Sequence, residues 1–249
     1  MYKLVLLRHG ESQWNLENRF TGWTDVDLTK KGKLEAKSAG KILKSKGLQF
    51  NLIYTSFLIR AQRTMKICIN ELRKDNFSIK NEWRLNERHY GALQGLNKID
   101  TAKKYGEKQV LIWRRSYDTP PPPLLKSDKQ NPRFDKKYIS LKDSEIPVSE
   151  SLKDTVERIV PLWEKSIKPD IFSNKKILIV AHGNSIRALI KYIDKISNKN
   201  IMELNIPTGV PLVYEFDGKL NPIKHYYLGN IDEINKRTSV VSAQGKVEL

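Results

Sequence analysis

The chain has 249 residues, of which 39% are hydrophobic and 29% are charged, a balance typical of a globular protein with a sizeable core. No apolar run approaches the roughly 20 residues that cross a bilayer, and charges appear too early at the N-terminus for a secretory signal peptide. The single cysteine, Cys68, excludes an internal disulfide and fits a reducing compartment. We therefore expect a cytosolic protein without a membrane role.

The charge balance is strongly basic. Lysine and arginine number 45 against 28 aspartates and glutamates, which gives a net charge of +17. Such a field attracts nucleic acid, anionic membranes or anionic metabolites. The basic residues are spread over nearly every segment, however, and no helix-turn-helix, zinc-finger or RNA-recognition signature accompanies them. We expect a lysine-rich solvated surface and no nucleic-acid partner, and a basic nucleic-acid-binding protein is the alternative from another functional class.

Strands and helices alternate in the first part of the chain. A continuous apolar run over 4–7 leads into Arg-His-Gly at 8–10, which is typical of a buried parallel strand followed by a loop. Thr29 can cap a helix with a small and apolar face. A short strand is predicted over 51–55, and the helix after it carries Cys68 on its apolar face, where core packing is a better interpretation than reactivity.

The middle of the chain departs from this alternation. From about 82 to 148 long periodic runs are scarce, and the four prolines at 120–123 are compatible with neither a regular helix nor a central strand. Aromatic and basic side chains crowd the approach to these prolines over 113–117. We expect an ordered insertion folded over a site, and a flexible linker between two domains is the alternative.

Regular alternation resumes with Ser151, which can cap a long helix that is kinked near Pro161. An apolar strand over 177–181 ends in His-Gly-Asn, and another strand is predicted over 211–216. The residues from about 232 to 249 are expected to form a mobile tail. Together these elements predict one α/β domain that spans the whole chain, with a mostly parallel sheet flanked by helices.

Two histidines occupy equivalent positions in this scheme. His9 and His182 each follow a buried strand directly and precede a turn that contains glycine. Ligands of open parallel sheets bind at the carboxyl ends of the strands, where loops and helix N-termini converge. We therefore expect both histidines in one site, although either one alone could be a structural residue. His89 is expected to hold its loop, and His225 is expected to be a surface residue.

The sequence Leu-Arg-His-Gly-Glu-Ser at 7–12 resembles the signature of the histidine phosphatase, or phosphoglycerate mutase-like, superfamily. The resemblance continues through segments at 20–23, 54–60, 85–91, 113–116, 120–123 and 181–185. Together these segments resemble the cofactor-dependent phosphoglycerate mutases along almost the whole chain. The resemblance implies a three-layer α/β/α fold, a homodimer or homotetramer, and a glycolytic and gluconeogenic isomerase that interconverts 3-phosphoglycerate and 2-phosphoglycerate.

The resemblance also implies a phosphohistidine at His9, primed by 2,3-bisphosphoglycerate and formed without a metal. A phosphoryl group in transit needs preset positive and donating groups, and Arg8, Arg60 and His182 can supply them. A backbone carbonyl that accepts from Nδ1–H of His9 would fix the tautomer that presents Nε2. The resemblance assigns Glu87 as the acid and base for the substrate hydroxyl.

Without the resemblance, a salt bridge to Arg84 or Arg88 would be the preferred interpretation of Glu87. The other expected substrate contacts are Ser12, Asn15, Thr21, Gly22, Tyr90, Lys98, Arg114, Arg115, Gly183 and Asn184. A mutase must hold the far carboxylate and second phosphate, because its phosphoenzyme has to outlive the reorientation of the bound intermediate. The prolines and the C-terminal tail are expected to cover the site.

Alternatives remain within the same superfamily. A phosphatase for small phosphomonoesters would share the inner residues, but the long insertion and the Arg114–Arg115 pair argue against it. A surface location is the alternative for that pair. A bisphosphoglycerate mutase tends to carry a bulkier residue in place of Gly22. The tip of the tail is less basic than the resemblance implies, so its role in closing the site has the weakest support.

Overall fold

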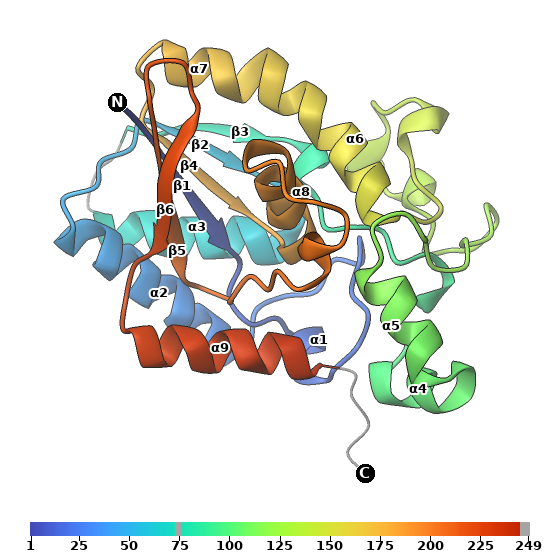
Figure 1. Ribbon diagram of the computed structural model, residues 1–249. Coiled ribbons are helices and arrows are strands. Elements are labelled where there is room, and N and C mark those ends of the chain that lie inside the picture. Colours follow the sequence, from blue (N-terminus) through green and yellow to red (C-terminus); the bar gives the residue numbers. More distant parts are fainter. Residues whose placement is uncertain (73–75, 245–249) are drawn as a thin grey trace.

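One six-stranded sheet organises the fold in the computed structural model, which describes residues 1–72 and 76–244 (Figure 1). The strands are β1 (Tyr2–Arg8), β2 (Leu52–Thr55), β3 (Ser78–Asn81), β4 (Ile177–Ala181), β5 (Pro211–Phe216) and β6 (Pro222–Tyr227). Their order is β3-β2-β4-β1-β5-β6. Neighbouring strands from β3 to β1 pair in parallel, whereas β5 pairs antiparallel with both β1 and β6. The predicted α/β fold with a mostly parallel sheet is confirmed.

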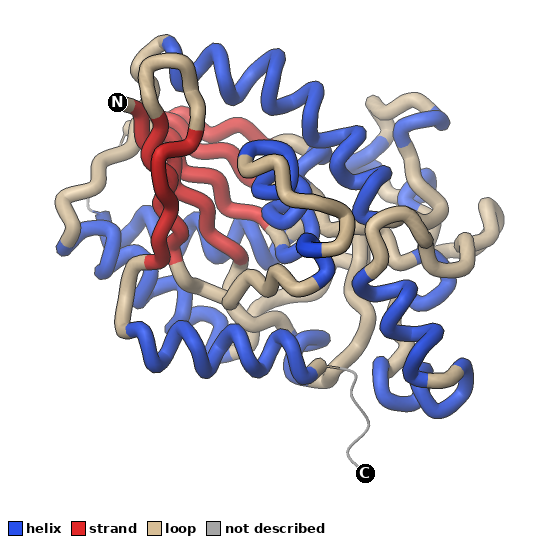
Figure 2. The backbone as a smooth tube through the Cα atoms, in the orientation of Figure 1, coloured by secondary structure: helices blue, strands red, loops and turns tan. Residues whose placement is uncertain are grey.

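Helices cover both faces of the sheet, so that strands lie between two helical layers (Figure 2). The helices are α1 (Gln13–Leu16), α2 (Lys30–Ser45), α3 (Ile59–Leu72), α4 (Lys98–Tyr105), α5 (Glu107–Arg115), α6 (Leu152–Leu162), α7 (Lys168–Phe172), α8 (Gly183–Ile193) and α9 (Ile231–Ala243). Within the described ranges, none of them is long and apolar enough to cross a membrane.

The side chains of β1 point alternately to the two faces of the sheet and so contribute to two separate hydrophobic cores. Leu4 and Leu6 pack in the core formed with α6, α7 and α8, whereas Val5 and Leu7 pack against α2 and α3, because successive strand residues point to opposite faces. Cys68 belongs to the second core and is fully buried. Burial raises the pKa of its thiol to about 12, which confirms the predicted packing role and keeps the thiol unreactive.

The predicted caps begin their helices as expected. The Thr29 hydroxyl accepts from the Gly32 N–H at 3.0 Å at the start of α2, and the Ser151 hydroxyl accepts from the Asp154 N–H at 3.2 Å at the start of α6. The predicted kink near Pro161 takes the form of a π-helical turn over Trp163–Ile167 that separates α6 from α7. Proline has no N–H for the regular helical bond, so a change of hydrogen-bonding pattern here is expected.

The insertion over 82–148 is ordered and lies at the carboxyl ends of the parallel strands (Figure 1). It contains α4 and α5, which the sequence analysis did not predict. None of the four prolines lines the cavity of the candidate site described below, which corrects their expected role as a cover. The Pro122 carbonyl accepts from the Ala92 N–H at 2.8 Å, and the Pro121 carbonyl accepts from the Ser149 hydroxyl at 2.7 Å.

The expected mobile tail is wrong for most of its length, because residues 231–243 form helix α9. The Asn230 side chain caps it by accepting from the N–H of Asp232 at 2.9 Å. Ile234 is buried, and the Arg237 guanidinium donates to the Thr208 carbonyl at 3.1 Å. The cap and these two anchors hold a helix that has no pronounced apolar stripe. The last residues of the predicted tail, 245–249, lie outside the described residues.

Candidate active site

The two strand-end histidines share one site. Strands β1 and β4 are parallel neighbours in which Arg8 lies opposite Ala181, so the residue after each strand reaches the same edge of the sheet. The rings of His9 and His182 are 4.9 Å apart between centroids, and both side chains are buried. A Cβ on Gly10 would lie 2.2 Å from the Gly32 carbonyl oxygen. The loop after β1 therefore needs glycine where it packs against the start of α2.

Two hydrogen bonds fix the tautomer of His9. Its Nδ1 lies 2.7 Å from the Gly10 carbonyl oxygen, and its Nε2 accepts from Nε–H of Arg60 at 3.3 Å. The proton must therefore be on Nδ1, with the Nε2 lone pair directed toward Arg60, as the phosphohistidine hypothesis requires. Burial, with Arg60 and Arg8 nearby, holds the pKa of His9 well below its usual value, so the imidazole is neutral at physiological pH.

His182 is held by a residue to which the sequence analysis gave no role. The Ser56 hydroxyl lies 2.7 Å from Nε2 of His182 and accepts from the Leu58 N–H at 3.2 Å, so its own hydrogen is free to donate to that nitrogen. When the hydroxyl donates, Nδ1 of His182 carries the ring proton. This atom is buried and has no hydrogen-bond partner among the described residues, so in that tautomer it is a donor available to a bound anion.

Arg8 and Arg60 are both buried at this edge of the sheet. The Arg60 guanidinium donates to the carbonyls of Gly22 at 2.8 Å and Thr24 at 3.0 Å. Arg8 donates to the Ile206 carbonyl at 2.7 Å, and its Nε has no partner within the described part of the chain. Burial lowers the pKa of Arg60 to about 10, which still leaves it charged at neutral pH.

Glu87 does not form the salt bridge that was its alternative interpretation. Its Oε1 accepts from the backbone N–H of Arg88 at 2.8 Å and of Asn184 at 3.1 Å. Arg84 pairs instead with Glu82 and Glu145. The Glu87 carboxylate lines a cavity together with Arg8.

That cavity collects nearly all the predicted contacts and has a volume of about 80 Å³. The predicted residues on its lining are Arg8, Asn15, Thr21, Gly22, Glu87, Tyr90, Lys98, Arg114, Arg115, Gly183 and Asn184. Three predicted residues are not on the lining but adjoin it. His9 follows Arg8 and His182 precedes Gly183 in the chain, and Arg60 donates to the Gly22 carbonyl. Ser12 is the exception, because its hydroxyl caps α1 by accepting from the Asn15 N–H at 3.3 Å.

The far end of the cavity is a cluster of cations. Lys98 and Arg114 are buried, which rules out a surface location for Arg114. Burial, together with Arg114 and Arg8, holds the pKa of Lys98 well below its usual value. The Lys98 ammonium donates to Oε1 of Gln244 at 3.0 Å, so the residue after α9 reaches the site. Like charges held this closely are costly without a bound anion.

Arg187 completes the cluster, and the sequence analysis missed it. It follows Gly183 by one turn of α8, so it lies on the helix face that meets the cavity. Its guanidinium donates to Oδ1 of Asn184 at 2.7 Å and to the Ile201 carbonyl at 2.6 Å. The sequence does carry a signal for this residue: Arg187 lies four residues after Gly183, which predicts the same face of the helix. Burial lowers the pKa of Arg187 to about 9.

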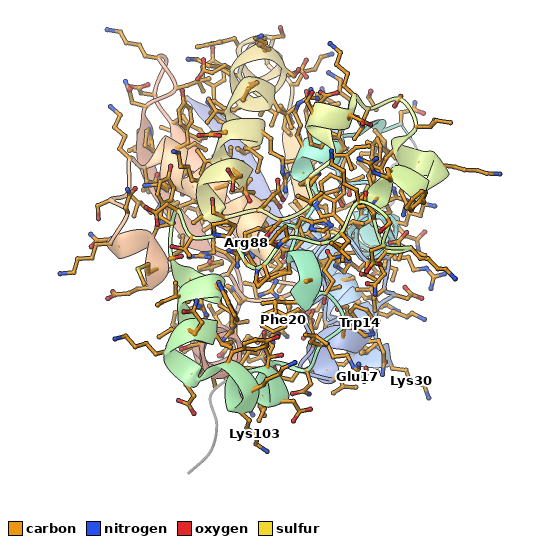
Figure 3. The ribbon with its side chains drawn as sticks, turned by 90° about the vertical axis from the view of Figure 1, so that its right-hand side faces the viewer. Trp14, Glu17, Phe20, Lys30, Arg88 and Lys103 are labelled. Carbon is orange, nitrogen blue, oxygen red and sulfur yellow. The ribbon has the colours of Figure 1, made fainter. Side chains whose placement is uncertain are left out.

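Aromatic packing supports Tyr90 at the cavity wall. Figure 3 views the molecule from the insertion side and labels Phe20 and Arg88, which both contact this ring. The Phe20 and Tyr90 centroids are 5.2 Å apart, and the Arg88 guanidinium lies 4.5 Å from the Tyr90 centroid. The Tyr90 hydroxyl oxygen accepts from Nδ2 of Asn184 at 3.2 Å, which leaves its hydrogen free for a ligand.

The two remaining histidines have the structural roles expected of them. Nδ1 of His89 accepts from the Gly91 N–H at 3.0 Å and holds the loop. The His225 side chain is 48% exposed and lies 3.4 Å from Asp194. Within residues 1–72 and 76–244, no three or more His, Cys, Asp or Glu side chains are grouped so that they could hold a metal ion.

Stability should fall as the pH drops from 7.5 to 5.5. The folded-state pKa values of His9, His89 and His182 are all lowered, that of His89 to about 3, with burial as the main cause. The unfolded chain therefore binds more protons below its histidine pKa of about 6.5, and stability is lost there. Each histidine should contribute a loss of about 1.4 kcal/mol at pH 5.5. Urea unfolding at both pH values measures the loss, and equal stabilities would contradict it.

Comparisons with known proteins agree with this geometry. The family model for the histidine phosphatase superfamily (branch 1) matches residues 4–228. A mycobacterial glucosyl-3-phosphoglycerate phosphatase superposes with a TM-score of 0.68 at 22% identity, covering 91% of this chain and 97% of that one. A putative alpha-ribazole-5'-P phosphatase from Escherichia coli K-12 gives 0.66 at 18%, with coverages of 92% and 98%. The alpha-ribazole phosphatase from Shigella flexneri gives 0.63 at 19%, with coverages of 92% and 96%.

These solved structures share the fold of the chain, and the family model spans both strand-end histidines. The chain therefore belongs to the histidine phosphatase superfamily, branch 1.

Proposed function

We propose that the protein is a phosphoglycerate mutase that interconverts 3-phosphoglycerate and 2-phosphoglycerate through a phosphohistidine at His9. The observation that carries the proposal is the cation cluster of Lys98, Arg114, Arg115 and Arg187, which lines the same cavity as Glu87. Hydrolysis of one phosphoryl group needs only the inner residues. A second set of cations suits a ligand with two anionic ends, such as 2,3-bisphosphoglycerate.

The chemistry begins at Nε2 of His9. Its lone pair attacks the phosphorus of 2,3-bisphosphoglycerate, the N–P bond forms, and the P–O bond to the substrate breaks. The departing oxygen takes its proton from Glu87, which must hold one when the ligand is bound. Arg60 can turn its Nε–H from His9 to a phosphoryl oxygen, while Arg8 and Nδ1–H of His182 supply further donors.

The second half-reaction runs in reverse with either hydroxyl of the bound phosphoglycerate. That hydroxyl gives its proton to Glu87 and attacks the phosphohistidine, which restores neutral His9. Retention of the intermediate decides whether the hydroxyl or water is the acceptor. The guanidinium groups of the cation cluster bind the carboxylate and the second phosphate in two-point contacts. The intermediate can therefore reorient in the cavity without dissociating.

A phosphatase acting on a small phosphomonoester is the second candidate, and the comparisons favour it. The solved structures named above carry phosphatase titles, for glucosyl-3-phosphoglycerate in one case and alpha-ribazole phosphate in the others. The same phosphohistidine with water as acceptor gives that activity. A bisphosphoglycerate mutase fits less well, because Gly22 has φ +53° and a Cβ there would lie 2.0 Å from Gln94. A bulkier residue is not tolerated at this position without moving Gln94.

The experiment that separates the two candidates measures transfer against hydrolysis. The protein is incubated with 3-phosphoglycerate and a small amount of 2,3-bisphosphoglycerate, and phosphorus NMR follows 2-phosphoglycerate and inorganic phosphate. A mutase forms 2-phosphoglycerate as the main product. Inorganic phosphate as the main product of the unaltered protein would reject the mutase and favour the phosphatase.

Arg115→Gln should shift the product ratio toward hydrolysis. The Arg115 side chain lines the cavity, and losing a charge-assisted contact of about 1.5–3 kcal/mol weakens retention of the intermediate. We expect the ratio of 2-phosphoglycerate to inorganic phosphate to fall by about tenfold or more. Lys103→Gln removes an exposed charge from α4 and should leave the ratio unchanged. An unchanged ratio in Arg115→Gln would count against the role of the far cations.

A further inference from the structure

A second cavity, of about 690 Å³, lies at the opposite end of α8 from the catalytic site. It is bounded by the C-terminal end of α8, the junction between α6 and α7, and the turn between β5 and β6. Its lining includes Tyr117, Trp163, Tyr192, Lys195, Lys219 and Leu220. None of these residues lines the catalytic cavity, and the mechanism uses none of them.

Irregular backbone gathers around this cavity. The non-glycine residues with positive φ in the described part of the chain are Asn18, Asn174, Lys195 and Leu220. Asparagine tolerates this conformation, whereas lysine and leucine adopt it at a cost. Lys195 at +52° and Leu220 at +62° both line the cavity. The π-helical turn of Trp163–Ile167 forms another wall. Irregularities of both kinds concentrate at ligand sites.

The two acidic side chains of the lining are already engaged within the protein, and four lysines share the lining with them. Glu164 accepts from the Lys168 ammonium at 3.0 Å and from the Tyr192 hydroxyl at 3.1 Å. Asp194 accepts from the Tyr214 hydroxyl at 2.7 Å. Lys195 and Lys219, in contrast, form no ion pair within 4.0 Å among residues 1–72 and 76–244. The charge left for a ligand is therefore positive.

The rest of the lining is aromatic and apolar. Tyr192 is 38% exposed at the lining, whereas Trp163 borders the cavity with only 4% exposure. The Lys191 ammonium lies 4.5 Å from the Tyr117 ring centroid. Leu220 and Ile193 are also buried at the lining. Flat apolar groups stack on such rings in a way that tolerates different bases. The cavity is also far larger than the catalytic one of about 80 Å³.

We propose that this cavity binds a nucleoside phosphate, with the base against the aromatic lining of Tyr117 and Tyr192 and the phosphates against Lys195 and Lys219. The lysines alone would bind any polyanion, and the aromatic lining alone would bind any flat apolar group. Their combination in one cavity selects a ligand that carries both.

The test uses ATP as the probe and the indole N–H resonances of the full-length protein as the readout. Vanadate is added first so that the catalytic cavity is filled, and Trp163→Phe identifies the resonance of Trp163. ATP should shift this resonance, and tripolyphosphate, which has no base, should bind about tenfold more weakly. Equal binding of ATP and tripolyphosphate, or ATP shifts confined to the other tryptophans, would overturn the proposal.

The double variant Lys195→Gly/Lys219→Gln tests the two cations. Glycine is compatible with the positive φ of Lys195, so the variant should be folded with at least the parent's melting temperature. Its affinity for ATP should fall by about a hundredfold, counting about tenfold for each of the two lost charge-assisted contacts. The matched variant Lys33→Gln/Lys41→Gln removes two exposed charges from α2 and should bind ATP as the parent does. Equal losses in both variants would show nonspecific attraction and reject the site.

Discussion

His9→Ala is expected to abolish phosphoryl transfer, with a loss of about 10⁵-fold or more in kcat. The variant removes the nucleophile, and His182 is not placed to replace it, because its Nε2 is bonded to the Ser56 hydroxyl. Incubation with labelled 2,3-bisphosphoglycerate should give the parent protein an acid-labile, base-stable phosphate that maps to His9. The variant should carry no such label.

The control for this experiment is His225→Ala. His225 is half-exposed on β6 and lies beside Asp194, so its loss should change neither the label nor kcat. Circular dichroism of both variants checks that they are folded. Label at another residue, or full labelling of His9→Ala, would rule out the phosphohistidine mechanism at this position.

Glu87→Gln is expected to slow phosphoryl transfer between phosphoglycerates by about 10²–10⁴-fold, equivalent to roughly 3–5.5 kcal/mol. The amide keeps an oxygen that can accept from the N–H groups of Arg88 and Asn184, so the loop should stay in place. It cannot give a proton to the departing oxygen or remove one from the attacking hydroxyl. Rapid-quench measurement of His9 phosphorylation reports the affected step directly.

A good leaving group distinguishes this role from a structural one. Para-nitrophenol departs without protonation, so phosphorylation of Glu87→Gln by para-nitrophenyl phosphate should be close to that of the parent. Glu82→Gln is the matched control, because Glu82 pairs with Arg84 outside the cavity. If the Glu87 variant were equally slow with both donors, the carboxylate would be a positioning group rather than the acid and base.

The elements that the sequence predicted are the ones with a buried face. The strands β1 and β4 are continuous apolar runs, and each leads straight to its histidine, so the meeting of His9 and His182 follows from parallel pairing. The strands β3 and β6 were missed because they lie at the two edges of the sheet, where most side chains are exposed and no apolar pattern marks them.

The inner site could be predicted further than its surroundings. Motif positions placed Arg8, Arg60 and Glu87 together, although 79 positions separate the first from the last. Ser56 acts through the ring of His182, and Arg187 reaches the cavity from the helical turn after Gly183. A single serine or arginine is too common in sequences to indicate a functional site by itself. The roles of the prolines and of α9 depend on packing between distant segments, which local composition does not reveal.

The crowding of Lys98, Arg114, Arg115 and Arg187 around an 80 Å³ cavity has a consequence for the lifetime of the protein in a cell. An anion that neutralises this cluster binds only the folded chain, so it raises the free energy of unfolding with the logarithm of its concentration. Proteases degrade the small unfolded fraction, and a shift of about 1–2 kcal/mol changes abundance several-fold. Turnover of the polypeptide should therefore slow when a phosphorylated metabolite that binds this cavity is plentiful, which pulse-chase labelling under changing nutrient supply can measure.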